Sequence, residues 1–134
     1  MLTYLCVALG SALGGVARFG LGGAVARLMG PDFPWGTILI NIIGSFIISF
    51  FGTLTISGGP LEAGPNLRAF VMVGLCGGFT TFSSFSLQTL ELAAGNQWLA
   101  ASANVGLSVV LCLLAVTAGH LAAGKFFITQ GAVL

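Results

Sequence analysis

Long apolar segments alternate with short connections along this chain. The four apolar segments cover residues 2–28, 35–56, 67–92 and 98–128. Each is long enough to cross a bilayer, because a membrane-spanning helix needs about 20 mostly apolar residues. All four prolines, which interrupt helices, fall in the connections at 30–34 and 57–65, and each of the three connections, including 95–97, contains at least one glycine. The pattern predicts an all-α membrane protein with four transmembrane helices in a single domain.

Composition agrees with this prediction and excludes one class of function. Of the 134 residues, 57% are hydrophobic and 5% are charged, whereas a typical soluble domain is about 25% charged. The net charge of +1 excludes a nucleic-acid binder that depends on neutralising phosphates. The three cysteines lie in apolar segments without metal-ligand spacing, so we interpret them as small packing residues. No basic segment precedes the first apolar run, and we therefore expect no cleavable signal peptide.

One segment of the third span, residues 74–88, departs from the apolar pattern. Its fifteen residues include three glycines, five hydroxyl side chains and three phenylalanines. Glycine is about 1 kcal/mol less favourable than alanine inside a helix, and every backbone group freed within a bilayer must find another partner. We therefore expect the third helix to be broken near residues 77–80, and we expect the functional centre to lie here.

A stripe of polar residues runs along the second apolar segment. Its members recur every fourth residue and so share one helical face: Thr37, Asn41, Ser45 and Ser49. The stripe either holds helices together through hydrogen bonds, each worth about 0.6 kcal/mol, or forms the polar wall of a pore. Asn41 favours the pore, because a carboxamide near the middle of a bilayer needs partners and its NH2 group offers two donors.

The polar side chains within the spans favour an anion as the conducted species. No carboxylate lies deep in a span, whereas proton-coupled transporters and cation pathways usually contain one. Arg18 either extends to the lipid headgroups or lines a water-filled vestibule that attracts anions. Phe82 and Phe85 share a helical face, and their positive ring edges either meet a small anion or make ordinary packing contacts. The neutral donors within the spans are Thr37, Asn41, Ser45, Thr81, Ser83, Ser84, Gln88 and Ser108.

The positive charges give almost no preference for either orientation in the membrane. Arg68 and Lys125 belong to one side, and Arg27, with Arg18 near it, belongs to the other. The positive-inside rule depends on an imbalance between the two sides. A chain without a preferred orientation can insert both ways, and four spans alone barely enclose a polar pathway. We therefore expect an antiparallel homodimer.

Three motifs closely resemble the Fluc (CrcB) family of bacterial fluoride channels. They are Gly-Leu-Cys-Gly-Gly-Phe-Thr-Thr-Phe-Ser-Ser-Phe-Ser at 74–86, Pro-Trp-Gly-Thr-Ile-Leu-Ile-Asn at 34–41 and Gly-Gly-Val-Ala-Arg at 14–18. The resemblance covers all four spans in order. It implies a dual-topology homodimer, surrounded by membrane lipid, with two antiparallel pores. Such a dimer would export fluoride passively from the cytoplasm across the bacterial inner membrane.

The resemblance also implies roles for individual residues. Asn41 matches the pore asparagine that contacts fluoride, and Phe82 and Phe85 match the aromatic residues whose ring edges line the ion path. The other matching positions are Thr37 at a pore mouth, Arg18 in the first span, Ser108 on a polar track of the fourth span, and Thr81 and Ser84 on the third-span side.

The resemblance further implies a structural sodium ion at the dimer axis. Gly77 and Thr80 match positions whose backbone carbonyls, one pair from each subunit, coordinate this ion. Oxygen ligands suit such a hard cation. The chain departs from the family pattern at three positions near the path. Gln88 stands where many members carry Glu, Cys112 where some carry Ser, and Asn104 where an aromatic residue can occur.

Other classes of membrane protein fit the sequence less well. A four-span multidrug exporter would need a carboxylate in the first span to couple protons to cationic drugs, and this chain has Arg18 there. A structural subunit would use the polar stripes only to hold helices together, and the purified protein would then carry no flux. An enzyme would need His, Asp, Glu or Cys residues at useful spacing, which the sequence lacks.

Overall fold

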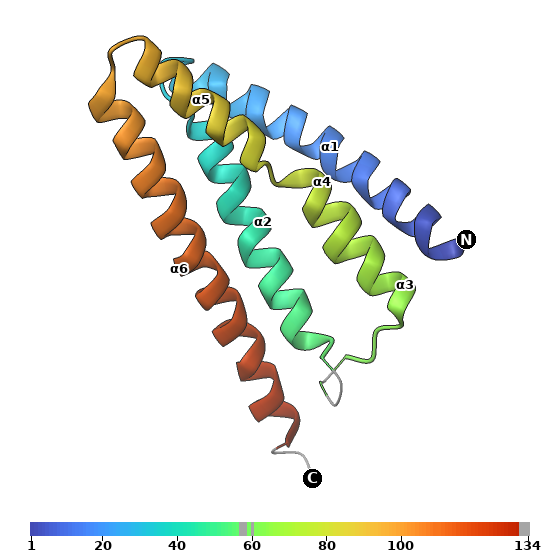
Figure 1. Cartoon of the computed structure of the whole chain (residues 1–134). Coiled ribbons are helices and arrows are strands. Elements are labelled where there is room, and N and C mark those ends of the chain that lie inside the picture. The colour runs from blue at the N-terminus through green and yellow to red at the C-terminus, as the bar shows by residue number, and fades with distance from the viewer. Residues whose placement is uncertain (57–58, 60, 132–134) are drawn as a thin grey trace.

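The fold is entirely helical over the part of the chain that the structure describes (Figure 1). The structure is a computed structural model that describes residues 1–56, 59 and 61–131, with side chains up to residue 126. The prediction of a loop over 57–65 falls partly outside the described residues. In chain order, the elements are α1 (Leu2–Met29), α2 (Trp35–Leu54), α3 (Pro65–Arg68), the π-helix η1 (Ala69–Cys76), α4 (Gly77–Phe79), α5 (Phe82–Ala94) and α6 (Trp98–Gly131).

Four helical segments of the described chain are long and apolar enough to cross a membrane. They cover Leu2–Met29, Trp35–Leu54, Pro65–Ala94 and Trp98–Phe126. Large apolar side chains face outward along them; Phe19 on α1, for example, is 86% exposed. Such apolar surfaces are stable in contact with lipid tails, which are themselves apolar. The prediction of an all-α chain with four potential membrane-spanning helices is confirmed.

Helix α2 is the central element of the bundle. It contacts α6, α1 and three elements of the third span, namely η1, α4 and α5. Helices α2 and α6 lie side by side (Figure 1). Gly119 of α6 allows this approach, because a Cβ there would lie 2.5 Å from the carbonyl oxygen of Phe46 on α2. The second apolar segment, with its polar stripe, therefore meets every other span.

Glycine contacts hold α1 directly against the third span. A Cβ on Gly74 of η1 would lie 2.9 Å from the Cα of Gly10, and a Cβ on Gly78 of α4 would lie 2.6 Å from the carbonyl oxygen of Ser11. Neither distance leaves room for a side chain. Small residues permit this kind of backbone-to-backbone packing, which stabilises helix pairs in membranes.

The third span is broken, but over a shorter stretch than the sequence predicts (Figure 1). Thr80 (φ −76°, ψ 157°) and Thr81 (φ −152°, ψ 112°) are extended and separate α4 from α5. The prediction that the irregular backbone begins at Gly77 is wrong, because Gly77–Phe79 is helical. The low helix propensity of two adjacent glycines is outweighed here by the packing of Gly78 against α1.

Two neighbouring glycines of α1 provide a test of this packing. We expect Gly14→Ala to lower the thermal unfolding midpoint in detergent, because its Cβ would lie 2.8 Å from the Phe79 nitrogen. Overpacking of this kind costs about 1–3 kcal/mol. The matched control is Gly15→Ala, whose Cβ would meet nothing within 4 Å. Both changes raise helix propensity equally, so equal midpoints for the two variants would contradict the packing account.

Candidate functional site

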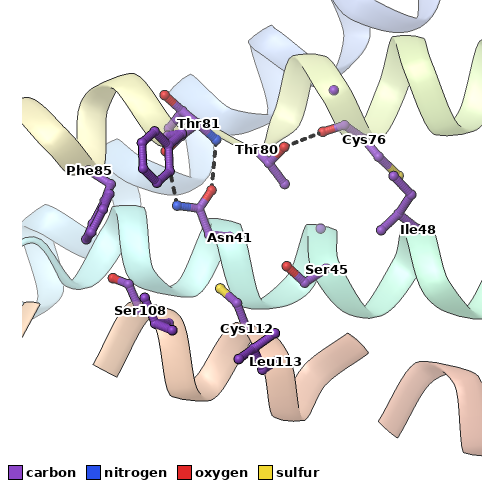
Figure 2. A pocket seen from close by; sticks show the side chains of 14 residues that line it. Asn41, Ser45, Ile48, Cys76, Thr80, Thr81, Phe85, Ser108, Cys112 and Leu113 are labelled. Carbon is purple, nitrogen blue, oxygen red and sulfur yellow. Dashed lines mark hydrogen bonds between the residues drawn. The ribbon is translucent and has the colours of Figure 1, made fainter. Parts of the chain in front are cut away.

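A cavity of about 390 Å³ lies where the broken third span faces α2 and α6 (Figure 2). Its polar lining comes from all three spans, and none of the described residues that line it carries a carboxylate or a basic side chain. Asn41 and Ser45 contribute from α2, Thr80 and Thr81 from the break, and Ser108 from α6. The structure therefore brings together polar residues that are widely separated in the sequence.

Asn41 pairs with the backbone of the helix break. Its Nδ2 donates to the Thr81 carbonyl oxygen at 3.1 Å, and its Oδ1 accepts from the Thr81 backbone N–H at 2.8 Å (Figure 2). These two bonds fix the orientation of the carboxamide and satisfy both backbone groups of Thr81. The Nδ2 group has two hydrogens, so it retains a second donor for a ligand in the cavity.

Thr81 also begins the next helix. Its Oγ1 accepts from the backbone N–H of Ser84 at 3.2 Å, which is the geometry of a helix N-cap. The same hydroxyl donates to the Ser84 Oγ at 3.0 Å. Thr81 lines the cavity, whereas Ser84 is not among its lining residues. Ser84 therefore supports the break through Thr81.

The break changes the hydrogen bonding of the carbonyl groups before it. In a continuous helix the Gly77 carbonyl would accept from the backbone N–H of Thr81, but that N–H donates to Asn41 instead. Thr80 is extended, and its carbonyl lies beyond the last helical residue, Phe79. Gly77 and Thr80 both line the cavity. Backbone oxygens released in this way are suitable ligands for a hard cation, so the residues present fit a sodium ion.

Among the described residues, no group of three or more His, Cys, Asp or Glu side chains is arranged to hold a metal. Any cation at the break would therefore depend on backbone and hydroxyl oxygens. Thr80 Oγ1 already donates to the Cys76 carbonyl at 2.9 Å, and its lone pairs remain available. This donor set matches alkali cations better than transition metals.

Phe82 and Phe85 lie together at the cavity but differ in exposure. Their ring centroids are 5.2 Å apart, with 50° between the ring planes. Phe85 is 8% exposed, and Phe82 is 79% exposed. Phe85 is packed within the chain, whereas Phe82 contacts Phe85 but leaves most of its ring exposed. Phe82 therefore lines the cavity with a ring that is largely exposed on the surface of this chain.

The remaining predicted site residues lie at different distances from this cavity. Ser108 lines it and is buried. Thr37 is buried on α2, one turn before Asn41, and it does not line the cavity. Arg18 is half-buried on α1 and lines none of the three described cavities.

Gln88 belongs to a separate cavity of about 310 Å³ near the turn that precedes α2. The carboxylates of Asp32 and Glu91 and the amide of Gln97 also line this cavity. The Gln88 Oε1 is buried and has no hydrogen-bond partner among the described residues. The structure therefore does not bring Gln88 together with Asn41, although the sequence places both near one pathway.

The sequence does not indicate that Cys76 lines the cavity or that Asn104 pairs with Thr89. Cys76 and Cys112 both line the main cavity (Figure 2); the comparison with the family pattern places Cys112 near the path, whereas the sequence predicts only a packing role for Cys76. Asn104 on α6 donates to Thr89 on α5 at 2.8 Å. The four-residue spacing of Phe85 and Thr89 could have indicated a shared face, but nothing in the sequence pairs that face with Asn104.

Comparisons with known proteins agree over nearly the whole chain. The model of the family described as "CrcB-like protein, Camphor Resistance (CrcB)" matches residues 5–120. A protein of Methylocella silvestris named "Fluoride-specific ion channel FluC" is 57% identical over 122 residues, which are 91% of this chain and 93% of that protein. Proteins of the same name from Opitutus terrae and Rhodospirillum rubrum are 57% and 55% identical over 123 and 130 residues. These alignments cover 92% and 97% of this chain and 93% and 99% of those relatives.

The Asn41–Thr81 pair gives a stability prediction that is independent of transport. We expect Asn41→Ala to lower the thermal unfolding midpoint, because it leaves a backbone N–H and a carbonyl at the break without their partner. Each unsatisfied buried group costs about 1–3 kcal/mol. The control is Thr53→Val, which removes one exposed interhelical bond to His120 and should change the midpoint much less. Equal losses in the two variants would contradict a special role for the Asn41–Thr81 pair.

Proposed function

Because the chain belongs to the CrcB family, we propose that it is a fluoride-selective ion channel that lowers cytoplasmic fluoride by passive export. It would be a multi-pass protein of the bacterial inner membrane. The observation that carries this proposal is the cavity at the break, where neutral donors from three spans meet two aromatic rings of the third span and no described lining residue is a carboxylate. The relatives are named as ion channels, which are not enzymes.

The cavity offers three kinds of positive group to an anion. Asn41 has one Nδ2 hydrogen beyond the bond that it makes to Thr81. Ser108 presents a hydroxyl from the opposite helix. The tilted pair of Phe82 and Phe85 presents ring edges, which carry the positive end of the aromatic quadrupole. Together, these groups would replace part of the water that fluoride loses on entry.

Selectivity would follow from the small size and fixed direction of these donors. Channel selectivity depends on pore diameter and on the groups that line the pore. Asn41 cannot move outward to admit a larger ion without breaking two bonds to Thr81. Chloride is larger and is a weaker hydrogen-bond acceptor, so the same donors would stabilise it less than fluoride.

A second copy of the chain would complete the pathway. Phe82 is 79% exposed at the edge of the cavity, so one chain leaves the pair of aromatic rings uncovered on one side. An antiparallel partner would cover it and would form an equivalent pathway with its own break, which gives two pores per dimer. The near balance of positive charge between the two membrane sides supports insertion in both orientations.

A sodium ion would occupy the contact between the two breaks. The carbonyls of Gly77 and Thr80 from each chain would hold it, and the release of the Gly77 carbonyl from Thr81 supports this assignment. The ion would supply positive charge that links the two chains, without being transported itself. Arg18 and Thr37 would act outside the cavity, at the approach to the pathway.

The direct test measures release of fluoride from liposomes that contain the purified protein. We expect fluoride to leave rapidly once an ionophore removes the opposing voltage, and we expect no chloride release above that of empty liposomes. Neutral donors and a rigid cavity would carry the smaller anion only. Equal release of both halides would contradict the selectivity, and no release of either would contradict the channel itself.

Two substitutions test the residues assigned to the pathway. We expect Phe82→Ile and Asn41→Asp each to slow fluoride release by roughly tenfold or more, because one removes a ring edge and the other places an acceptor where a donor is needed. The matched control is Phe19→Ile, which changes an aromatic residue of similar exposure on α1 away from the cavity. Full activity in either pathway variant would remove that residue from the pathway.

A further inference from the structure

A chain of hydrogen bonds, centred on the buried Asn104, joins two residues of the cavity that lie on different helices. Ser108 Oγ donates to Asn104 Oδ1 at 3.4 Å, Asn104 Nδ2 donates to Thr89 Oγ1 at 2.8 Å, and Thr89 Oγ1 donates to the Phe85 carbonyl at 2.8 Å. Its two ends, Ser108 and Phe85, line the cavity, whereas Asn104 and Thr89 do not. The connection therefore runs behind the cavity wall, from α6 to α5.

We propose that Asn104 is a positioning residue for anion conduction, which acts through Ser108 by keeping its hydroxyl available to the cavity. This inference rests on the proposed channel function. It assigns Asn104 a role behind the pathway, without contact with the conducted ion.

The direction of the hydrogen bonds fixes the orientation of the Asn104 side chain. Thr89 has one hydroxyl hydrogen, which it donates to the Phe85 carbonyl, so its oxygen can only accept from Asn104. The carboxamide must therefore direct Nδ2 toward Thr89 and Oδ1 toward Ser108. Asn104 is 0% exposed, so water offers no alternative partner. Ser108 consequently faces an acceptor whose position is fixed.

Other hydroxyl groups in this chain show what Ser108 would do without that acceptor. Ser86, Thr89 and Thr117 each donate to the carbonyl oxygen four residues earlier in their own helix, at 2.8–2.9 Å. This is the usual choice for Ser and Thr in apolar helices. Ser108 instead donates to a side chain, that of Asn104. Asn104 thus diverts the Ser108 hydrogen from a short bond along the helix axis.

The diverted bond is also long. Its length of 3.4 Å exceeds the usual 2.5–3.0 Å for O–H···O hydrogen bonds. The free-energy cost of rotating the Ser108 hydroxyl away from Asn104 is therefore small. An anion in the cavity is a stronger acceptor than a neutral amide. The hydroxyl would turn toward a passing anion and return to Asn104 afterwards. A firm bond to the helix backbone would hinder that exchange.

Fluoride release from liposomes, measured in a double-mutant cycle, tests this role. We expect Asn104→Leu, which keeps the side-chain volume, and Ser108→Ala each to slow release by about tenfold, the effect of losing one hydrogen bond to the ion. The double variant should be no slower than Ser108→Ala alone, because Asn104 acts through the Ser108 hydroxyl. Thr89→Val should slow release severalfold, because the carboxamide loses the partner that orients it.

One control and one second test variant separate this role from simple helix packing. Thr53→Val removes a bond between α2 and α6 outside the cavity and should conduct like the unmodified protein. Thr89→Val is a second test variant: it retains the Asn104 side chain but removes its partner, so it carries the test if Asn104→Leu does not fold. In a Ser108→Ala background, Thr89→Val should have no further effect.

Three results would overturn the inference while the unmodified protein conducts fluoride. The first is normal conduction by Asn104→Leu. The second is a double variant that is slower by the product of the two single effects, since independent packing effects multiply. The third, if Asn104→Leu does not fold, is a Thr89→Val effect that persists in the Ser108→Ala background. Failure of the unmodified protein to release fluoride would overturn the proposed function, and this inference with it.

Discussion

The pairing of Asn41 with Thr81 is the interaction on which the rest of this structure depends. A helix cannot be interrupted within a bilayer unless its backbone groups find other partners. One carboxamide satisfies both backbone groups of Thr81, and the Thr81 hydroxyl then starts α5. Because α5 begins there, Phe82 and Phe85 fall at the cavity. The same pairing releases the Gly77 carbonyl, so the proposed anion and cation sites have a common cause.

Glycine packing supplies the geometry that this pairing needs. Gly10, Gly74 and Gly78 allow α1 and the third span to touch through their backbones. On the side of α2, a Cβ on Gly44 would collide with the Cγ2 methyl of Thr80 in the break, so glycine at this position leaves room for the break to lie against α2. The break is therefore held from two sides by surfaces without side chains, and its polar groups can face the cavity.

The helices and the break could be predicted from the sequence, but the exact position of the break could not. Length and apolar composition determine which segments can span a bilayer, and the four spanning helices follow from them. Helix propensity suggested that Gly77 and Gly78 would be irregular, whereas tertiary packing keeps them helical. Helix propensity depends on residues that are close in the sequence, whereas packing against α1 depends on the tertiary structure.

Residues of the candidate site can be predicted from the sequence where the spacing of polar residues along one helix indicates them. They cannot be predicted where the relative position of two helices decides which residues meet. The four-residue spacing along α2 indicated Asn41, which lines the cavity. Asn104 and Ser108 are four residues apart, so helical periodicity puts both on one face of α6. Periodicity within α6 cannot show that Thr89 of α5 contacts Asn104. The distinction between Ser108 in the cavity and Gln88 in another cavity likewise depends on how the helices lie in space.

The most direct test of the central claim is the reversal potential of the purified protein in a planar bilayer under opposed fluoride and chloride gradients. A cavity whose donors are fixed by the Asn41–Thr81 pair should pass fluoride alone. We expect a reversal potential at the fluoride equilibrium potential, unchanged when the chloride gradient is altered. A potential that follows chloride, or one near zero under these gradients, would contradict it.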